Sequence, residues 1–213
     1  MYKFSKTERA YCPPTVTKVI FLDIDGVLQP HSSQKRFNHI KDGSITKLYE
    51  ELKRTHNVDY SVYNKRDVAA VYYDWRKSSV ALLRDILLKT GAKIVLSSDW
   101  RIFGMNTMYD FFTIHGLEKY YIDQTIDSSY DLKDDEFNNL KDKYRIKYKN
   151  NDIYFWRVIE ILDYLNQYPH IKNYVAVDDL MLNPGLENHF VQTNDWITDA
   201  DAADILKILE SND

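Results

Sequence analysis

Residues 19–26 read VIFLDIDG, an apolar run that changes abruptly into acidic residues and a glycine. Pro13 and Pro14 precede the run, and prolines of this kind punctuate regular structure. A short apolar run between turn signals is typical of a strand that is buried on both faces, as in a parallel sheet. We therefore predict a buried strand over Val19–Leu22 that delivers carboxylates at its C-terminal end.

Two further apolar runs end in the same way. Ala92–Leu96 is followed by two serines and an aspartate, and Tyr174–Val177 is followed by two aspartates. In open α/β sheets, ligands bind outside the C-terminal ends of the strands. The polar residues after the three runs should therefore meet at one edge of the sheet and form the functional site.

Helical patterns separate and follow these runs. Apolar residues recur at three- and four-residue steps over residues 80–87, and Gly91 should stop this helix. A last amphipathic helix over residues 202–209 has Thr198 and Asp199 as candidate caps. Strands that alternate with helices predict an α/β fold, a Rossmann-like doubly wound parallel sheet.

We predict a single domain over residues 1–213 that contains two insertions. Residues 31–73 leave the core between the first strand and the next helix, so they should form a small cap or rim beside the site. Residues 128–153 are densely charged, and basic residues alternate with aromatic or apolar ones over Lys143–Lys149. This period of two indicates either a solvated surface ribbon or a strand whose basic face attracts a phosphate-bearing polymer.

The composition is that of an ordinary soluble protein, with 44% hydrophobic and 28% charged residues. A net charge of −4 argues against a protein that binds nucleic acid over its whole surface. The one cysteine, Cys12, cannot form an internal disulfide, and no apolar stretch has the length of a membrane span. Residues 1–10 lack the pattern of a secretory signal. We expect a cytoplasmic protein with no membrane partner, and the sequence indicates no obligate protein partner.

Asp23 and Asp25 are the first candidates for chemistry. Side chains two residues apart along a strand point to the same side, so their negative charges repel each other. At a separation of about 4 Å the repulsion is about 4 kcal/mol in an effective dielectric near 20, and a bound Mg²⁺ would offset it. The alternative is that both carboxylates only cap a sharp turn, which Gly26 allows.

Other residue types that phosphoryl transfer needs should reach the same edge. Asp178 and Asp179 offer further acids for a metal site. A hydroxyl comes from the serine pair at residues 97–98, and Arg157, which opens the helix before the third run, offers a fixed positive charge. Catalysis of phosphoryl transfer depends on positioning, charge neutralisation and an in-line nucleophile, and this set of residues supplies all three.

These stretches resemble the motifs of the haloacid dehalogenase (HAD) superfamily. The similar segments are FLDIDGVL at 21–28 (motif I), IVLS at 94–97 (motif II), Arg157 in place of the motif III cation, and VDD at 177–179 (motif IV). More narrowly, LSSDWR at 96–101, the helix that contains Arg157 and the tail at 190–202 look like the small HAD branch found in Swiss Army Knife RNA repair proteins. The likeness covers residues 18–28, 74–127 and 155–210.

The resemblance implies a role for each residue of the site. Asp23 would attack phosphorus and become an aspartyl phosphate, while Asp25 would protonate the leaving oxygen and then activate water. Ser97 would bind a phosphoryl oxygen, and Arg157 would hold Asp23 and the phosphate. The implied ligands of Mg²⁺ are Asp23, the backbone carbonyl of Asp25, and either Asp178 or Asp179.

The serine pair and Arg101 have alternative assignments, and Arg157 departs from the family pattern. Ser97 has the better position for the motif II hydroxyl, and Ser98 is the second candidate, with a role in substrate binding. Arg101 either binds substrate, as we also predict for Gly26, or is structural and ties the start of a helix to an acid. Arg157 stands where much of the superfamily has lysine, which keeps the charge but changes the hydrogen-bond geometry.

The predicted cap contains residues suited to a base or another ring that carries phosphate. They are Tyr60, Tyr63, Arg66, Tyr72 and Tyr73, which offer flat apolar faces and a cation. His31 follows motif I closely and is a candidate substrate contact.

The sequence therefore predicts a Mg²⁺-dependent phosphohydrolase that cleaves a phosphomonoester through an aspartyl phosphate. Its substrate would be a phosphorylated small molecule, such as a nucleotide, or a nucleic-acid end. One alternative is a phosphotransferase that uses the same intermediate, and another is a catalytically silent phosphate-binding protein on the same scaffold. The intact set of acids, hydroxyl and cation argues against the silent alternative.

Overall fold

Five parallel strands form the centre of the computed structural model, which describes residues 12–127, 152–183 and 185–211 and a few isolated positions between 133 and 139. Their order across the sheet is β3-β2-β1-β4-β5. The strands are β1 (Lys18–Leu22), β2 (Lys93–Leu96), β3 (Tyr121–Gln124), β4 (Asn173–Asp178) and β5 (Phe190–Gln192). Because β2 and β4 flank β1 on opposite sides, the strand order reverses at β1, as a doubly wound fold requires.

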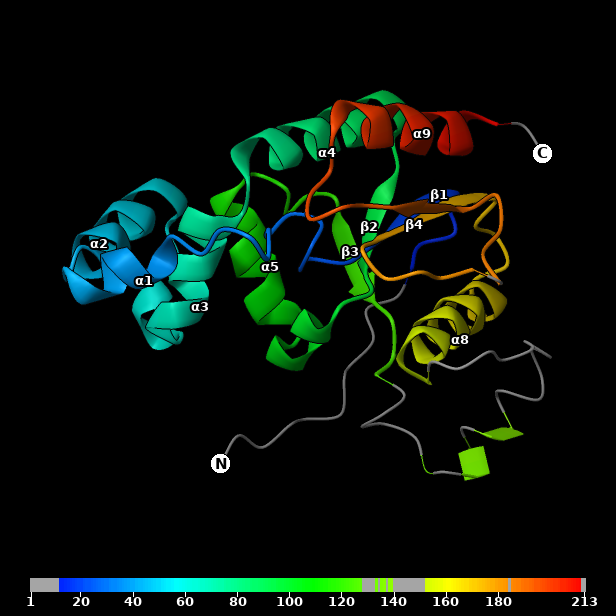
Figure 1. Cartoon of the computed structure of the whole chain (residues 1–213), viewed down its shortest axis with the longest axis horizontal. Helices are drawn as coiled ribbons and strands as arrows, with labels where there is room; N and C mark the ends of the chain where they lie inside the picture. Colours follow the sequence, from blue (N-terminus) through cyan, green and yellow to red (C-terminus); the bar gives the residue numbers. More distant parts are fainter. Residues whose placement is uncertain are drawn as a thin grey trace.

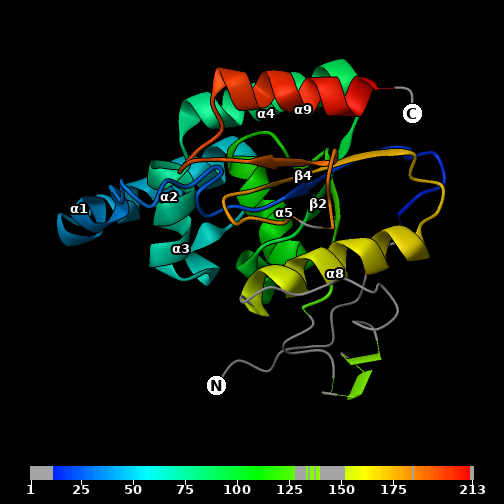
Figure 2. The same ribbon diagram turned by 45° about the vertical axis from the view of Figure 1, so that its right-hand side comes forward.

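Helices cover both faces of the sheet (Figure 1). α4 (Lys77–Thr90) and α9 (Asp199–Glu210) lie side by side on one face, and α8 (Asp152–Gln167) lies on the other, as the turned view in Figure 2 also shows. Side chains of a strand alternate between the faces, so Ile20 and Leu22 pack in the core beneath α4 while Val19 and Phe21 pack in the core beneath α8. This burial on both sides explains why β1 reads as an unbroken apolar run. The predicted α/β architecture is confirmed.

The outer strands β3 and β5 differ from the predicted ones because neither is an apolar run. β3 reads YIDQ, and its buried Asp123 accepts a hydrogen bond of 3.0 Å from the hydroxyl of Tyr164 in α8. β5 has only three residues, of which Val191 alone is buried. Polar or very short strands at the edges of a sheet lack the pattern that reveals the central ones.

Two helix ends follow the predicted signals. α4 ends at Gly91, whose φ of +70° is a conformation that favours glycine. Of the two candidate caps of α9, Thr198 is the N-cap: its hydroxyl accepts from the backbone N–H of Asp201, and the carboxylate of Asp201 accepts from the backbone N–H of Thr198.

The insertion at residues 31–73 follows β1 and extends beyond one end of the sheet (Figure 1). It contains α1 (Arg36–Lys41), α2 (Ile45–His56), the 3-10 turn η1 (Tyr60–Val62) and α3 (Lys65–Ala69), and it runs into a π-helical turn, η2 (Ala70–Asp74). The buried face of α2, including Leu48 and Leu52, belongs to the same core as the inner face of α4. α5 (Met105–Ile114) contacts both α2 and β3, so it joins the insertion to the sheet.

The second predicted insertion, residues 128–153, lies almost wholly outside the described residues, and so does the alternating stretch Lys143–Lys149. Its interpretation stays a prediction. α8 begins at Asp152, inside the predicted range. Among the helices of the described segments, none combines the length and the apolar character needed to cross a membrane.

Candidate active site

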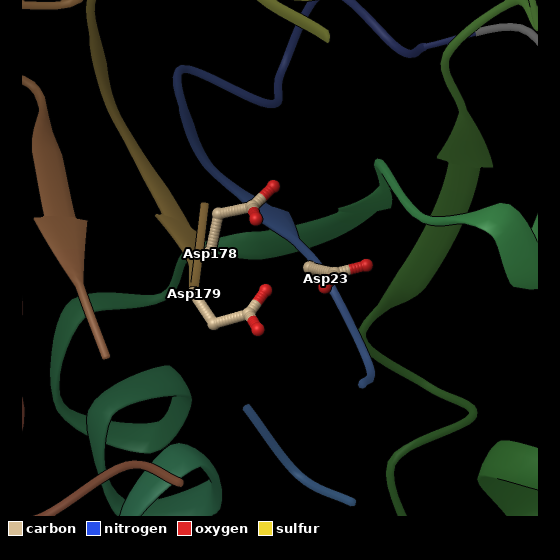
Figure 3. A group of neighbouring side chains, drawn as sticks. All are labelled: Asp23, Asp178 and Asp179. Carbon is tan, nitrogen blue, oxygen red and sulfur yellow. The ribbon is translucent and has the colours of Figure 1, made fainter. Parts of the chain in front are cut away.

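Three aspartates meet at the C-terminal ends of β1 and β4 (Figure 3). Asp23 directly follows β1, Asp178 ends β4, and Asp179 comes next. One carboxylate oxygen from each lies within 4.8 Å of the other two. Asp23 and Asp178 are buried, whereas Asp179 is half-buried. The cluster forms because β1 and β4 are neighbours in the sheet although they are far apart in the sequence.

Arg157 places a positive charge between two of these carboxylates. Its Nη1 donates to Asp23 Oδ1 over 3.2 Å, to Asp178 Oδ2 over 3.0 Å and to the backbone carbonyl of Ser97. The sequence predicted Arg157 at the start of this helix. Because α8 begins at Asp152, Arg157 lies in its second turn. Burial alone would lower the pKa of the guanidinium, but the charges of Asp178 and Asp23 outweigh burial and raise it, so Arg157 stays charged.

The acids of the cluster need more neutralisation than one guanidinium gives. Burial raises the pKa of Asp23 and of Asp178, and the neighbouring charge of Asp23 adds to the rise at Asp178. The cluster's span of 4.8 Å is close to the distance of about 4.2 Å between opposite oxygens around a Mg²⁺ ion. Carboxylate oxygens are also the ligands that Mg²⁺ prefers. The residues therefore fit a hard divalent cation after a small movement of the side chains.

Asp25 is held by two donors outside this cluster. Gln29 Nε2 donates to Asp25 Oδ1 over 2.5 Å, and Trp100 Nε1 donates to Asp25 Oδ2 over 3.0 Å. Gln29 returns to Asp25 because the chain turns sharply between them, with the backbone N–H of Gly26 donating to the carbonyl of Gln29 over 2.8 Å. The sequence singled out neither Gln29 nor Trp100 as a residue of the site. Metal coordination by the backbone carbonyl of Asp25 stays a prediction.

The two serines after β2 have different surroundings. The Ser98 hydroxyl contacts Asp23, and its oxygen accepts from the backbone N–H of Trp100 at the start of the 3-10 helix η3 (Asp99–Phe103). The Ser97 hydroxyl is buried and has no hydrogen-bond partner among the described residues. A buried hydroxyl without a partner is costly, and a phosphoryl oxygen would satisfy it. Both serines therefore stay candidates for the hydroxyl that binds phosphate.

Gly26 contributes to the site through its lack of a side chain. Its φ is +70°, and a Cβ atom at this position would lie 2.5 Å from both Cγ and Oδ2 of Asp179. The hydroxyl of Thr193 donates to the carbonyl of Gly26 over 2.7 Å and fixes the same loop from the other side. The loop after β1 thus packs directly against a candidate metal ligand. A contact between Gly26 and substrate stays a prediction.

Arg101 is buried and its guanidinium is engaged by protein groups. Nε donates to the carbonyl of Ser98 over 2.7 Å, and Nη1 donates to Glu160 over 2.6 Å and to the hydroxyl of Thr125 over 2.7 Å. These contacts tie η3 to α8, which is the structural alternative that the sequence left open. The predicted contact of Arg101 with substrate stays a prediction, and these protein groups already engage Nε and Nη1 of the guanidinium.

A cleft of about 550 Å³ opens beside Asp179, and its walls are His31, Asp179 and residues 192–195. Its volume lies in the usual range of small-molecule sites. His31 Nε2 lies 3.1 Å from Asp179 Oδ2, and Asp195 accepts from the backbone N–H of His31. The start of the insertion is thereby held against the loop after β5. His31, a predicted substrate contact, lies on the wall of this cleft.

The tyrosines of the insertion serve packing more than recognition. Tyr60 is fully buried and its hydroxyl donates to the carbonyl of Asp110 over 2.8 Å, while the hydroxyl of Tyr63 donates to the carboxylate of Asp110. Both side chains attach the insertion to α5, so the predicted contact of Tyr60 with a substrate ring is wrong. Tyr73 stacks on His39, with 3.7 Å between ring centres, and lines a second cleft.

Comparison with known families accounts for this arrangement. The model of the HAD domain in Swiss Army Knife RNA repair proteins matches residues 19–202, which is most of the chain. The chain belongs to this family. The predicted superfamily and branch are thereby confirmed. No significant match is found among curated proteins or among solved structures.

Membership in the HAD family indicates chemistry of the phosphohydrolase type. HAD enzymes generally use Mg²⁺, and the three-aspartate cluster of this HAD domain could hold such an ion. The arrangement agrees with that expectation, because the buried acids, the guanidinium and the serine hydroxyls gather at one edge of the sheet. The roles of the individual residues stay predictions.

Proposed function

We propose that this HAD domain is a Mg²⁺-dependent phosphomonoesterase in which Asp23 is the nucleophile. The main support is the contact of Arg157 with both Asp23 and Asp178, beside Asp179. This contact joins a nucleophile, a fixed cation and metal ligands in one group at the sheet edge where ligands bind. Preorganised charge of this kind is the main requirement of phosphoryl transfer.

In the proposed reaction, a carboxylate oxygen of Asp23 bonds to phosphorus as the ester bond to the leaving oxygen breaks. Asp25 gives its proton to that oxygen, and it then takes a proton from the water that attacks the aspartyl phosphate. The attack releases inorganic phosphate and restores the Asp23 carboxylate. Arg157 orients Asp23 throughout. Mg²⁺ held by Asp23, Asp178 and Asp179 would supply positive charge for the phosphoryl oxygens.

Release of inorganic phosphate from 4-nitrophenyl phosphate, with Mg²⁺ and with excess chelator, tests this proposal. We expect turnover only with the divalent ion, and none in Asp23→Asn. No release from this probe, from nucleotides and sugar phosphates, or from phosphorylated oligonucleotides would favour the silent alternative. Transfer of phosphate to an added alcohol in place of water would favour the phosphotransferase alternative.

The second cleft supports a substrate with more than one phosphate, such as a nucleotide or a nucleic-acid end. It has a volume of about 390 Å³, and Lys35, Arg76 and Lys77 contribute to its lining. The one carboxylate in the lining, Asp74, is 3.0 Å from Arg36 Nη1 and so is already paired. Three cations in one cleft would neutralise phosphates that do not react.

The segment at residues 30–33 contributes to the walls of both clefts. Pro30 and Ser33 line the cationic cleft, whereas His31 between them lines the cleft beside Asp179. A polymer could therefore present its terminal phosphate to one cleft and an inner phosphate to the other.

Charge removal in the cationic cleft tests this choice of substrate. In Lys35→Gln with Lys77→Gln, we expect KM for a 5′- or 3′-phosphorylated oligonucleotide to rise and to depend less on salt, while hydrolysis of 4-nitrophenyl phosphate is unchanged. Lys89→Gln, an exposed position at the other end of α4, is the matched control. If the double variant and the control have the same KM and salt dependence on the oligonucleotide, the cleft no longer supports a nucleic-acid end as the substrate.

A further inference from the structure

A chain of polar contacts leads from Asp25 into the insertion. The side chain of Gln29, which donates to Asp25, accepts at its own Oε1 a hydrogen bond of 3.2 Å from Arg36 Nη1. Gln29 is buried, so its amide depends on these two partners. Arg36 is the first residue of α1. A single side chain, that of Gln29, therefore links the carboxylate proposed as the acid to the insertion.

Arg36 is fixed in turn by Asp74. Its Nη1 lies 3.0 Å from Asp74 Oδ2, and its backbone N–H donates to Asp74 Oδ1 over 2.9 Å. The side chain of Asp74 has no exposed surface. Because Arg36 lies near the beginning of the insertion and Asp74 lies at its end, this pair closes the segment between them at its base.

The chemistry of arginine fixes which groups donate and which accept in this series of hydrogen bonds. A guanidinium can only donate hydrogen bonds, so Arg36 fixes the amide oxygen of Gln29 toward itself and turns the NH₂ group toward Asp25. Without Arg36, the amide oxygen of Gln29 would lose its donor, and the amide could turn away from the carboxylate. With Arg36 in place and Trp100 Nε1 on the other oxygen, the carboxylate of Asp25 is held in one orientation.

We propose that Gln29, Arg36 and Asp74 are positioning residues that orient Asp25 for proton transfer, so that the docked insertion sets the geometry of the acid. The proposal rests on the proposed function. It gives the insertion an effect on catalysis that does not require contact with the substrate. A displaced acid slows proton transfer while the contacts of Asp23 and Arg157 persist, so the loss falls on kcat more than on KM.

Two probes with different leaving groups test this role. Proton donation matters most when the leaving oxygen is a poor leaving group. We expect Arg36→Met to lower kcat/KM for glycerol 2-phosphate by about tenfold or more, and for 4-nitrophenyl phosphate by less than about threefold. Lys53→Met is the control, because it breaks an exposed ion pair with Asp59 (3.4 Å) in the same insertion, and it should leave both values unchanged.

Two further measurements show whether Arg36 acts through Gln29. Gln29→Met should reproduce the selective loss, and the double variant should lose no more than Gln29→Met alone, since coupled residues are not additive. The indole N–H resonance of Trp100 reports its hydrogen bond to Asp25 without any turnover. This resonance should shift in Arg36→Met and stay in place in Lys53→Met. If Arg36→Met does not fold, Arg36→Lys, which keeps the charge beside Asp74, should show a smaller loss of the same kind.

Equal losses on the two probes, additive losses in the double variant, or an unmoved Trp100 resonance would each overturn the positioning role. A wild-type protein that hydrolyses neither these probes nor nucleotides, sugar phosphates or phosphorylated oligonucleotides would instead refute the proposed function. In that case the Trp100 resonance still decides whether Arg36 orients Asp25.

Discussion

The two faces of the sheet differ in what they bury. On the α8 face, the helix contributes charge: Arg157 contacts Asp23 and Asp178, and Glu160 lies 2.6 Å from Arg101. On the opposite face, α4 and α9 contribute almost only apolar side chains, among them Leu83 and Ile205. Helices cover both faces, and the difference lies in the chemistry of the side chains that they bury.

This difference separates function from stability. The desolvation of buried ion pairs offsets most of their attraction, so they add little net stability while fixing the geometry of the groups involved. Each fully buried aliphatic side chain, by contrast, stabilises the fold by about 1.5–3 kcal/mol. We therefore expect substitutions of the charged groups beneath α8 to remove activity, and substitutions of the apolar side chains beneath α4 to remove stability.

Asp23→Asn should have the largest effect on activity and almost none on stability. An amide is a poor nucleophile, so kcat should fall by at least about three orders of magnitude, or about 4 kcal/mol. The free energy of unfolding should change by no more than about 1 kcal/mol, because Arg157 keeps its contact with Asp178. Kinetics and urea unfolding measure the two effects. Asp85→Asn, exposed on α4, is the control and should alter neither. A residual rate above about a tenth of wild type would exclude the covalent role.

Removal of the metal should abolish activity. Thermal unfolding with and without Mg²⁺ should show whether the three aspartates bind the ion. A ligand that binds only the folded state raises Tm, so Mg²⁺ should raise the Tm of the wild type. The shift should shrink or vanish in Asp178→Asn and in Asp179→Asn, and should persist in Leu83→Ala on the other face. Full activity after exhaustive chelation would refute the metal site.

Leu83→Ala tests the same difference between the two faces through stability. The fully buried Leu83 leaves a cavity, and we expect a loss of about 2–5 kcal/mol in the free energy of unfolding with kcat per folded molecule unchanged. Leu88→Ala, in the same helix but 60% exposed, should cost much less. If kcat falls with stability, the two faces are coupled and the separation proposed here does not hold.

The α4 face contains a pH-sensitive group, His115. His115 stacks on Trp75, with 5.2 Å between ring centres, and its Nε2 lies 2.8 Å from the carbonyl of Val71. Burial lowers the pKa of His115 from its ordinary value of 6.5 to about 4, because it disfavours the charged imidazole. The unfolded chain therefore binds the proton more readily than the folded one between these values.

The stability that neutral His115 contributes is complete above about pH 6.5 and is lost as the pH falls toward about 4. At about 1.4 kcal/mol per pH unit, the loss is about 3 kcal/mol. The free energy of unfolding, measured with urea across this pH range, should depend less on pH in His115→Gln than in the wild type. The amide of the variant can still donate to the carbonyl of Val71. Parallel curves for variant and wild type would show that other groups cause the acid sensitivity.

The central strands and most of the cluster could be predicted because their signal is local. β1, β2 and β4 read as apolar runs that end in polar residues, and the parallel sheet alone then brings Asp23 and Asp178 together. The helix caps at Gly91 and Thr198 were equally visible, since each depends on one residue type at one place.

The remaining features depend on contacts between distant segments. Trp100 reaches Asp25 across 75 positions, and no pattern in either segment indicates that pairing. The sequence shows Gln29 only as an amide four residues after an acid. Its contact with Asp25 follows from the turn between them, which the structure shows. Tyr60 looked like a recognition residue because aromatic side chains suit both cores and binding surfaces, and only the fold decides between them.

The close approach of Gly26 to Asp179 limits how this active site can evolve. Any replacement at position 26 would bring a β-carbon to 2.5 Å from the carboxylate and would push Asp179 away from Asp23. A library that varies this loop should therefore return almost only glycine here. New substrate choice has to come from residues that tolerate exchange, and two of these are Gln192 and Asn194, which are exposed on the wall of the larger cleft. The proposed chemistry can thus be redirected to new phosphate esters without disturbing the loop after β1.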